Sequence, residues 1–264
     1  MQSFDTVLTP RTQVDGTCIL HVPEGWGQGK TVFGGFVVGA LVRAMGNLET
    51  DATRRLRSLS AELVGAPKVG DARITVRTLR RGSAVTTICA ELSQDGELLT
   101  HAVGVFGADR PFKEPREPLH RPEMPRWQDL PAADMKNPFA PEFTQNFEYR
   151  PVQGFPFSGG APTTSGWVRP AVTPERRDDA VVAAMADAWW LAEFVAMREP
   201  RPAATLTFGL DLHAPLTGLA PDAPLFHHGE SIIRTDGYAS EVRTLWREDG
   251  QLVSINRQLT CIIK

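Results

Sequence analysis

The sequence is poor in cysteine and has no strong excess of charge of either sign. Its three cysteines, Cys18, Cys89 and Cys261, are an odd number and lack the spacing of a metal site. The net charge of −3 provides no general attraction to nucleic acid or to an anionic membrane. We therefore predict reduced, buried cysteines of the kind found in the cytoplasm, no nucleic-acid partner, no metal and no cofactor.

The sequence also lacks a secretory leader and a long hydrophobic run. Residues 1–5 do not combine a basic segment with an apolar one, as a signal peptide does. The main apolar stretch, at 31–45, is too short and too interrupted to span a membrane. With 264 residues and 42% hydrophobic content, the chain can build one large or two modest cores. We expect cytoplasmic localisation and no membrane insertion.

The stretch at 31–45 predicts a buried helix that begins with two adjacent glycines. Its apolar residues follow helical spacing and cover nearly every side of the helix. Gly34 and Gly35 lie at the start, where the backbone N–H groups of a helix have no partner within the helix. Without side chains, they let a ligand approach these donors; the alternative is that they permit close packing against a sheet.

A set of strands and then a proline-dense segment follow this helix. The strand candidates lie at 56–63, 72–80, 84–92 and 98–106. The Asp-Gly pair at 95–96 separates two apolar runs, which is a strong hairpin signal. From Pro111 to Pro141 prolines alternate with charges, which predicts an extended linker on the surface, with Trp127 and Phe139 holding it in place.

The second half of the chain repeats the first. Asp178–Asp187 aligns with Gly34–Arg43 without a gap, and Asp249-Gly250 repeats the earlier Asp-Gly turn. Strand candidates lie at 143–152, 203–213, 226–234, 239–246 and 252–263. A loop follows the first of these strands and ends at Trp167. We infer a duplication, with an N-terminal repeat at 1–110, a linker at 111–141 and a C-terminal repeat at 142–264.

The repeats indicate an α+β fold. An antiparallel sheet wrapped around one long apolar helix is the hotdog architecture. Two such units in one chain form a double hotdog, in which the two tandem helix-plus-antiparallel-sheet repeats pair as a pseudo-dimer. Exposed sheet edges also favour further pairing, so we expect a homodimer or a larger homo-oligomer.

Candidate site residues are those in which the second repeat differs from the first. Asp187, Thr205 and Gln258 align with Arg43, Arg57 and Gly104, respectively. The neighbours of Asp187 at helical spacing are apolar, and a buried carboxylate is costly unless it is paired or hydrogen-bonded.

Together these three side chains suit hydrolysis by a held water. A carboxylate can act as general base toward water, and a hydroxyl and an amide can hold that water. One difficulty is that strand alternation places Thr205 on the polar face of its strand. A bulge at the start of the strand, or a helix on the small-residue face, would resolve it.

Several motifs together resemble the acyl-CoA thioesterase II family. They are Phe33–Gly39, Phe147–Val152, Ala186-Asp187, Ala204-Thr205 through His213-Ala-Pro, and Leu252-Val253 through Gln258. The resemblance implies a double-hotdog enzyme that hydrolyses an acyl-CoA thioester to a free acid and CoA. It implies that Asp187, Thr205 and Gln258 position the attacking water. By analogy with other hotdog proteins, the N–H groups of Gly34 and Gly35 would bind the oxyanion and substrate.

The sequence departs from that family in two places, and it leaves two other functions open. The strand after Thr205 is less bulky than in the family, and the linker is denser in proline; both concern the preferred acyl chain. One alternative is a non-catalytic acyl-CoA or lipid-binding hotdog protein. The other is an enoyl-CoA hydratase or dehydratase, because His21–Gly25 faintly resembles the histidine motif of hotdog dehydratases. The His227-His228 pair is predicted to lie at a surface strand end.

Overall fold

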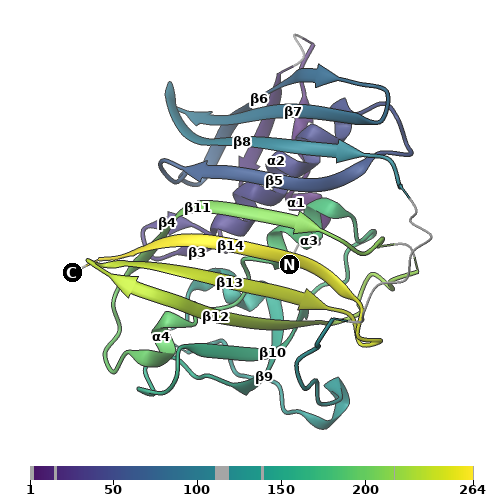
Figure 1. Cartoon of the computed structure of the whole chain (residues 1–264). Coiled ribbons are helices and arrows are strands. Elements are labelled where there is room, and N and C mark those ends of the chain that lie inside the picture. Colours follow the sequence, from purple (N-terminus) through teal and green to yellow (C-terminus); the bar gives the residue numbers. More distant parts are fainter. Residues whose placement is uncertain (1–2, 15–16, 111–118, 138–139, 217, 264) are drawn as a thin grey trace.

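One antiparallel sheet forms the frame of the protein. The computed structural model describes residues 3–14, 17–110, 119–137, 140–216 and 218–263. The sheet has twelve strands in the order β1-β2-β6-β7-β8-β5-β11-β14-β13-β12-β10-β9 (Figure 1). Their bounds, in that order, are Arg11–Thr12, Cys18–Val22, Gly70–Arg81, Val85–Gln94, Glu97–Gly107, Arg55–Leu63, Ala203–Leu212, Leu252–Ile262, Tyr238–Trp246, Leu225–Thr235, Thr163–Pro170 and Phe147–Gln153.

The two halves of the chain contribute adjacent parts of this sheet. Strands β1, β2 and β5–β8 come from the first half, and β9–β14 come from the second. The halves meet where β5 pairs antiparallel with β11, for example Leu59 with Leu210. Two helix-plus-sheet units are therefore joined edge to edge in one continuous sheet.

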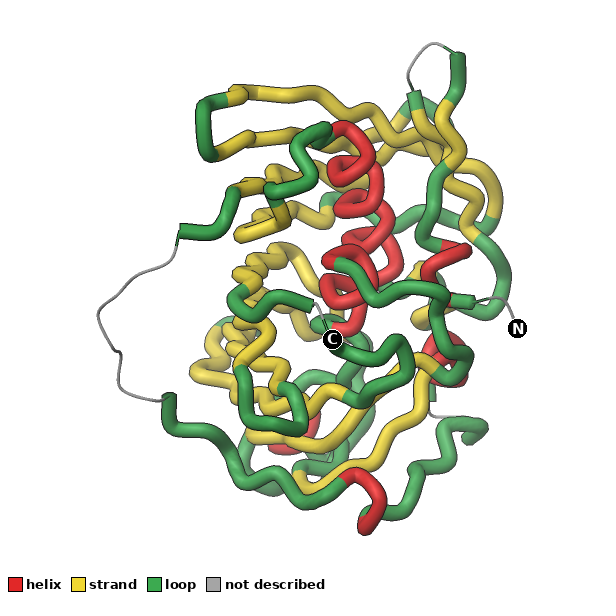
Figure 2. The backbone as a smooth tube through the Cα atoms, turned by 90° about the vertical axis from the view of Figure 1, so that its right-hand side faces the viewer, coloured by secondary structure: helices red, strands yellow, loops and turns green. Residues whose placement is uncertain are grey.

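The helices lie on one face of the sheet (Figures 1 and 2). They are α1 (Phe4–Val7), α2 (Gly34–Leu48), α3 (Asp179–Met185) and α4 (Glu193–Ala196), with short 3-10 turns at Trp127–Asp129 and Glu142–Asn146. Two further short strands, β3 (Gly27–Gln28) and β4 (Thr31–Val32), form a hairpin before α2. The predicted long helix is confirmed as α2, which is buried from Gly35 to Met45.

Helices α2 and α3 pack against each other through small residues. A Cβ added at Gly39 would lie 2.9 Å from the carbonyl oxygen of Ala180, and one added at Gly35 would lie 2.5 Å from that of Ala184. These contacts leave no room for a side chain, so the glycines allow the two backbones to approach. The start of α2 therefore lies at the end of α3, and the helices run antiparallel.

The inner faces of the two half-sheets differ in polarity. In the first half, Ala102, Gly104 and Phe106 alternate toward the core, and Gly104 leaves room for Met45 of α2. In the second half, the buried residues of β14 are mostly polar; they include Ser254, Asn256, Gln258 and Thr260. Since buried polar groups need hydrogen-bond partners, this face predicts a polar network inside the second half.

Three details of the predicted organisation are wrong. Residues 163–167, predicted as the end of a loop, belong to strand β10 (Thr163–Pro170). The first residues of the predicted strand at 143–152 form a 3-10 turn, and β9 begins at Phe147. The second helix ends at Met185, two residues before Asp187.

The proline-dense segment is held to the second half by a tryptophan, as predicted. Trp127 is buried and lies in a cluster with Trp167, Phe226 and Trp246. The guanidinium of Arg150 lies 4.2 Å from the centre of its ring. The other predicted contact, Phe139, lies outside the described residues. The segment is thus attached to the C-terminal half of the sheet.

The three cysteines, all within the described part of the chain, are free. Cys18 and Cys89 are buried, and Cys261 is half-buried. Trp26 and Trp189 are buried in the core, and Trp190 is partly buried. Within the described ranges, no helix is long and apolar enough to cross a membrane.

Candidate active site

Asp187 lies in a turn directly after α3, where it approaches the start of α2. The prediction that it lies on the helix is wrong, because side chains bind the carbonyl groups of the following residues. The Tyr149 hydroxyl donates to the carbonyl of Ala188 at 2.8 Å, and Arg243 Nη1 donates to that of Trp189 at 3.4 Å. These bonds stabilise a turn that directs the carboxylate toward the sheet of the second half.

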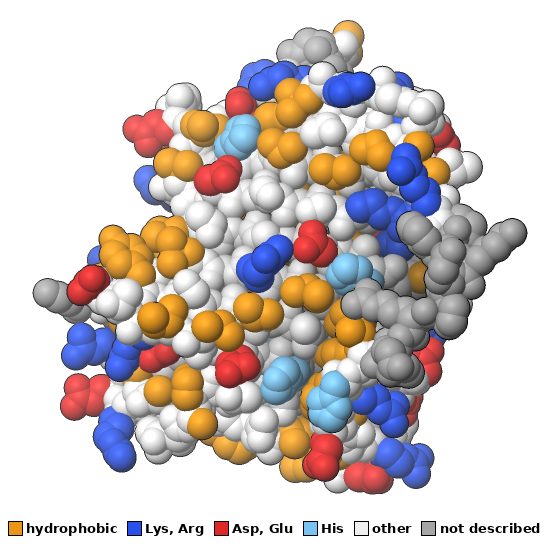
Figure 3. All heavy atoms as spheres, viewed as in Figure 1, with side chains coloured by type: hydrophobic (Ala, Val, Ile, Leu, Met, Phe, Trp, Pro, Cys, Tyr) orange, Lys and Arg blue, Asp and Glu red, His pale blue; other side chains and the backbone are white. Residues whose placement is uncertain are grey.

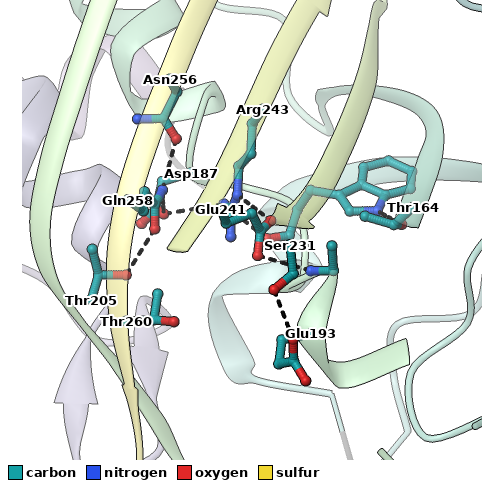
Figure 4. Close-up of polar contacts among 12 residues, drawn as sticks. Thr164, Asp187, Glu193, Thr205, Ser231, Glu241, Arg243, Asn256, Gln258 and Thr260 are labelled. Atoms are coloured by element: carbon teal, nitrogen blue, oxygen red, sulfur yellow. Dashed lines mark hydrogen bonds and ion pairs between the residues drawn. The ribbon is translucent and has the colours of Figure 1, made fainter. Parts of the chain in front are cut away.

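The structure brings the three predicted polar residues into one hydrogen-bonded chain (Figure 4). The Thr205 hydroxyl donates to Gln258 Oε1 at 3.0 Å. Gln258 Nε2 donates to Asp187 Oδ1 at 2.8 Å and to Asn256 Oδ1 at 2.9 Å. Because the amide accepts at one end and donates at the other, it fixes the orientation of both partners.

A bulge in β11 places Thr205 on the inner face of the sheet. The pairing with β14 shifts between Thr205, which pairs with Thr260, and Thr207, which pairs with Leu259. Thr207 is exposed, while Phe208 is buried. The extra residue thus reverses the alternation, so that Thr205 shares a face with the apolar residues of its own strand. Of the two arrangements that the sequence left open, the structure has the bulge.

The strand registers refine the comparison between the repeats. Leu56 pairs with Phe106 just before a bulge in β5, as Thr205 pairs with Thr260 just before the bulge in β11. The counterpart of Thr205 is therefore Leu56, and the predicted alignment with Arg57 is wrong by one residue. Gly104 pairs with Leu59 as Gln258 pairs with Phe208, which agrees with the predicted alignment.

Arg243 is the site residue that the sequence analysis missed. Its side chain is 2% exposed and donates to Asp187 Oδ1 at 3.4 Å and to Glu241 Oε1 at 2.8 Å. Its counterpart in the first half is Ala90, because Ala90 pairs with Ala102 as Arg243 pairs with Asn256. A position-by-position comparison of β7 with β13, like the comparison of the repeats that identified Gln258, would have identified Arg243.

The glycine pair lies directly beside Asp187. The backbone N–H of Gly35 lies close enough to the Asp187 carboxylate to lower its pKa. A Cβ added at Gly34 would lie 3.0 Å from Asp187 Oδ2 and 3.2 Å from Leu63 Cδ2. The first half thus provides the helix start, and the second half provides the carboxylate, hydroxyl and amide.

Burial is the main influence on the charge of Asp187. Loss of hydration raises the pKa of this carboxyl group above its usual value, against the opposing effects of Arg243, Gln258 and the Gly35 N–H. A raised pKa makes a carboxylate a stronger base. The same burial raises the pKa of Glu241, so Arg243 lies between two carboxyl groups that both depend on it.

His227 lies inside the protein, so the prediction of a surface strand end is wrong. Its ring is fully buried and stacks on Trp189, with centroids 5.0 Å apart and an interplanar angle of 9°. The reason is that β12 is an interior strand, between β10 and β13. Burial and the charge of Arg243 lower the pKa of His227 well below its usual value, so the imidazole is neutral.

Two tandem helix-plus-sheet units, with a polar cluster where their helices meet, define a protein of the hotdog-fold class. A model of the acyl-CoA thioesterase N-terminal domain matches residues 22–107, and one of the acyl-CoA thioesterase C-terminal domain matches residues 116–262. The chain therefore belongs to the acyl-CoA thioesterase family, and it is a thioester hydrolase.

Solved structures share this fold over the whole chain. A conserved hotdog-fold protein from Alicyclobacillus acidocaldarius has a TM-score of 0.90 and 22% identity, covering 100% of this chain and 99% of the other. The tesB protein of Mycobacterium avium subs paratuberculosis has a TM-score of 0.79, 18% identity and coverage of 99% and 98%. The acyl-CoA thioesterase II TesB2 of Mycobacterium marinum has a TM-score of 0.77, 19% identity and the same coverage. A search of curated protein sequences found no match.

Proposed function

We propose that the protein hydrolyses acyl-CoA thioesters by direct attack of a water molecule held by Asp187, Thr205 and Gln258. The observation that supports this most is the hydrogen-bonded chain of these three side chains at the start of α2. Asp187 takes a proton from the water as the oxygen attacks the thioester carbon. The CoA sulfur then leaves and is protonated, which yields the free acid and CoA.

Each side chain has a distinct part in this mechanism. Asp187 is the general base, and its raised pKa suits that function. The Thr205 hydroxyl already donates to Gln258, so its lone pairs remain to accept a hydrogen bond from the water. Gln258 orients both groups, and Arg243 is a positioning residue that keeps Asp187 charged before the reaction.

The oxyanion is assigned to the start of α2. The positive end of the helix dipole and the N–H groups of Gly34 and Gly35 favour negative charge there. Because the Gly35 N–H lies near Asp187 and stabilises its charge, Gly34 is the first donor available to the thioester oxygen. Protonation of Asp187 during the attack weakens its hold on Gly35, which frees the second donor as the oxyanion forms.

The first test is release of CoA from a panel of acyl-CoAs, measured with a thiol reagent. Asp187→Asn should lower kcat by about 10²–10⁴-fold, the usual contribution of a general base. Thr205→Val should lower kcat by a smaller factor. The matched controls are Thr207→Val and Asp211→Asn, which change the outward face of the same strand.

The panel also separates the two alternatives. Binding of acyl-CoA without release of CoA would indicate a lipid-binding protein, and addition of water to an enoyl-CoA without release would indicate a hydratase. Wild-type turnover by folded Asp187→Asn would contradict the proposed base. The acyl chain length follows from which panel members react fastest.

We propose the organisation around this site as well. The repeats at 1–110 and 142–264, joined by the linker at 111–141, would pair as a pseudo-dimer, with one site between the halves. We also predict a cytoplasmic homodimer or larger homo-oligomer. Light scattering of the purified protein measures the assembly, and folding of the separately expressed repeats tests the boundaries.

A further inference from the structure

Three potential metal ligands converge on the face of the first half-sheet opposite α2. Cys89 and Glu91 lie on β7, and His101 lies on β8 directly opposite Glu91. One ligand atom of each lies within 4.8 Å of the others. Cys89 is buried but lies outside the apolar core, whereas its neighbours Ile88 and Ala90 belong to that core. The thiol therefore points to the outer face.

The outer face is accessible from solvent around this cluster. Figure 3 views the same side of the sheet as Figure 1 and shows acidic, basic, histidine and apolar side chains interspersed over it. The His101 side chain is 36% exposed, and Glu91 is half-buried. An ion can thus reach the Cys89 sulfur by displacing flexible side chains, without any movement of the strands.

The distance between the thiol and the imidazole matches a tetrahedral metal site. Cys89 Sγ lies 3.4 Å from His101 Nε2. Zinc–sulfur and zinc–nitrogen bonds of about 2.3 Å and 2.0–2.1 Å at a tetrahedral angle require a separation of about 3.5 Å. The two atoms are therefore already spaced as ligands of one ion, whether or not they also share a weak hydrogen bond.

Glu62 provides an independent indication of the same chemistry. Its carboxylate lies 3.1 Å from His101 Nδ1, the ring nitrogen that faces away from Cys89. Metal-binding histidines usually donate their second N–H to a carboxylate, which fixes the tautomer that leaves the other nitrogen free to bind. Glu62 lies on β5, so the arrangement extends across three adjacent strands.

Charged side chains lie near the Cys89 thiol. Arg77 pairs with Cys89 across β6 and β7, and Glu91 lies two residues further along β7. A divalent cation bound between the sulfur and Glu91 would stabilise the thiolate by its own positive charge. Thiolate together with imidazole favours zinc over the harder ions magnesium and calcium.

We propose that Cys89, Glu91 and His101 form a zinc-binding site, with Glu62 orienting His101 and water completing the coordination. On binding, the Cys89 thiol releases its proton to solvent and the sulfur–zinc bond forms, with no change of oxidation state. The ion would join β7 to β8 on the outer face, apart from the cluster around Asp187.

The test is titration of the whole protein, first treated with a chelator, with Co²⁺ and then with Zn²⁺. We expect one ion per chain and a near-ultraviolet thiolate-to-cobalt band, which Zn²⁺ then removes. Cys89→Ser should abolish the band. His101→Gln and Glu91→Gln, at half-exposed positions, should weaken binding while the chain stays folded. Glu62→Gln should lower affinity by about 10–100-fold, as loss of a supporting carboxylate usually does.

Cys18→Ser and Cys261→Ser are the matched controls, and both should keep the band. Absence of a thiolate band in the wild-type protein would overturn the proposal. A band that persists in folded Cys89→Ser, or an unchanged affinity for Co²⁺ in folded His101→Gln, would overturn it as well, because it would place the ion elsewhere. Thioesterase activity, measured in parallel, reports on the Asp187 site independently.

Discussion

Gly34 and Gly35 are adjacent in the sequence, yet the structure predicts different main effects when each is changed to alanine. A Cβ at Gly34 would contact the Asp187 carboxylate and the flexible end of Leu63, at 3.0 and 3.2 Å. A Cβ at Gly35 would lie 2.5 Å from the backbone oxygen of Ala184, so α2 and α3 would have to separate. The first change alters the site, and the second alters the helix packing.

The two changes differ in their expected free energy of unfolding. Alanine favours a helix over glycine by about 1 kcal/mol, whereas overpacking of a core costs about 1–3 kcal/mol. At Gly34 the nearest side chains can move by a few tenths of an ångström, so the two effects nearly cancel. At Gly35 the added Cβ would clash with a backbone carbonyl oxygen, which cannot move aside as a side chain can. We therefore expect Gly35→Ala to lower the free energy of unfolding by about 1–2 kcal/mol.

The two substitutions, Gly34→Ala and Gly35→Ala, also differ in their expected effects on turnover. The methyl group of Gly34→Ala would occupy space beside Asp187 Oδ2 and exclude the water that the base must activate. We expect kcat to fall by about 10²-fold or more, within the range that a general base contributes. Gly35→Ala should also disturb the carboxylate that its N–H holds, in addition to its effect on stability.

The assay combines CoA release with urea unfolding of both variants. Gly46→Ala is the matched control, because Gly46 lies in the same helix with no atom within 4 Å of an added Cβ. It should gain about 1 kcal/mol of stability and keep full activity. Wild-type kcat in Gly34→Ala, with the substitution confirmed, would refute the placement of the water beside Asp187 Oδ2.

Three further predictions concern pH and packing. Burial raises the pKa of Asp179 to about 6, so ionisation costs the native state about 3 kcal/mol as pH rises from about 4 to about 7. Asp179→Asn should flatten that loss in urea unfolding at the two pH values; an unchanged slope would contradict it. Arg243→Lys should move the acid limb of the kcat/KM profile to higher pH, because weaker pairing raises the pKa of Asp187 further; no movement would mean that Arg243 does not act through it. Trp127→Ala should cost about 3–5 kcal/mol and speed proteolysis of the proline-dense segment; unchanged stability would show that the segment is not held there.

The sequence could predict the repeats because each depends on local patterns. The helix start at Gly34, the hairpin turn at Asp95 and the strands around it follow from periodicity and turn residues. Comparison of the repeats then indicated Asp187, Thr205 and Gln258, which the structure brings into one hydrogen-bonded chain.

What the sequence could not provide depends on contacts between distant segments. The turn that ends α3 before Asp187 is stabilised by Tyr149 and Arg243, which lie on other strands. The position of His227 depends on which strands flank β12. The cluster at Cys89 and His101 has no metal-type spacing along the chain, because its members are brought together across two strands.

The end of the helix pair opposite Asp187 holds the counterparts of residues in the Asp187 cluster. There Arg43 of α2 pairs with Asp178 at 3.0 Å, and Asp179 accepts the backbone N–H of Leu56 at 2.9 Å. The ion pair joins the two repeats, since each supplies one of the charges.

This arrangement constrains how the sequence can change. A second site would need both charges to be replaced together, because removal of Asp178 would leave the buried Arg43 guanidinium without its ion-pair partner. Single substitutions therefore pass through a destabilised intermediate. An ancestor with two equivalent sites could lose one of them easily. Its descendant would regain the second site only by a coordinated double change, so the asymmetry is hard to reverse.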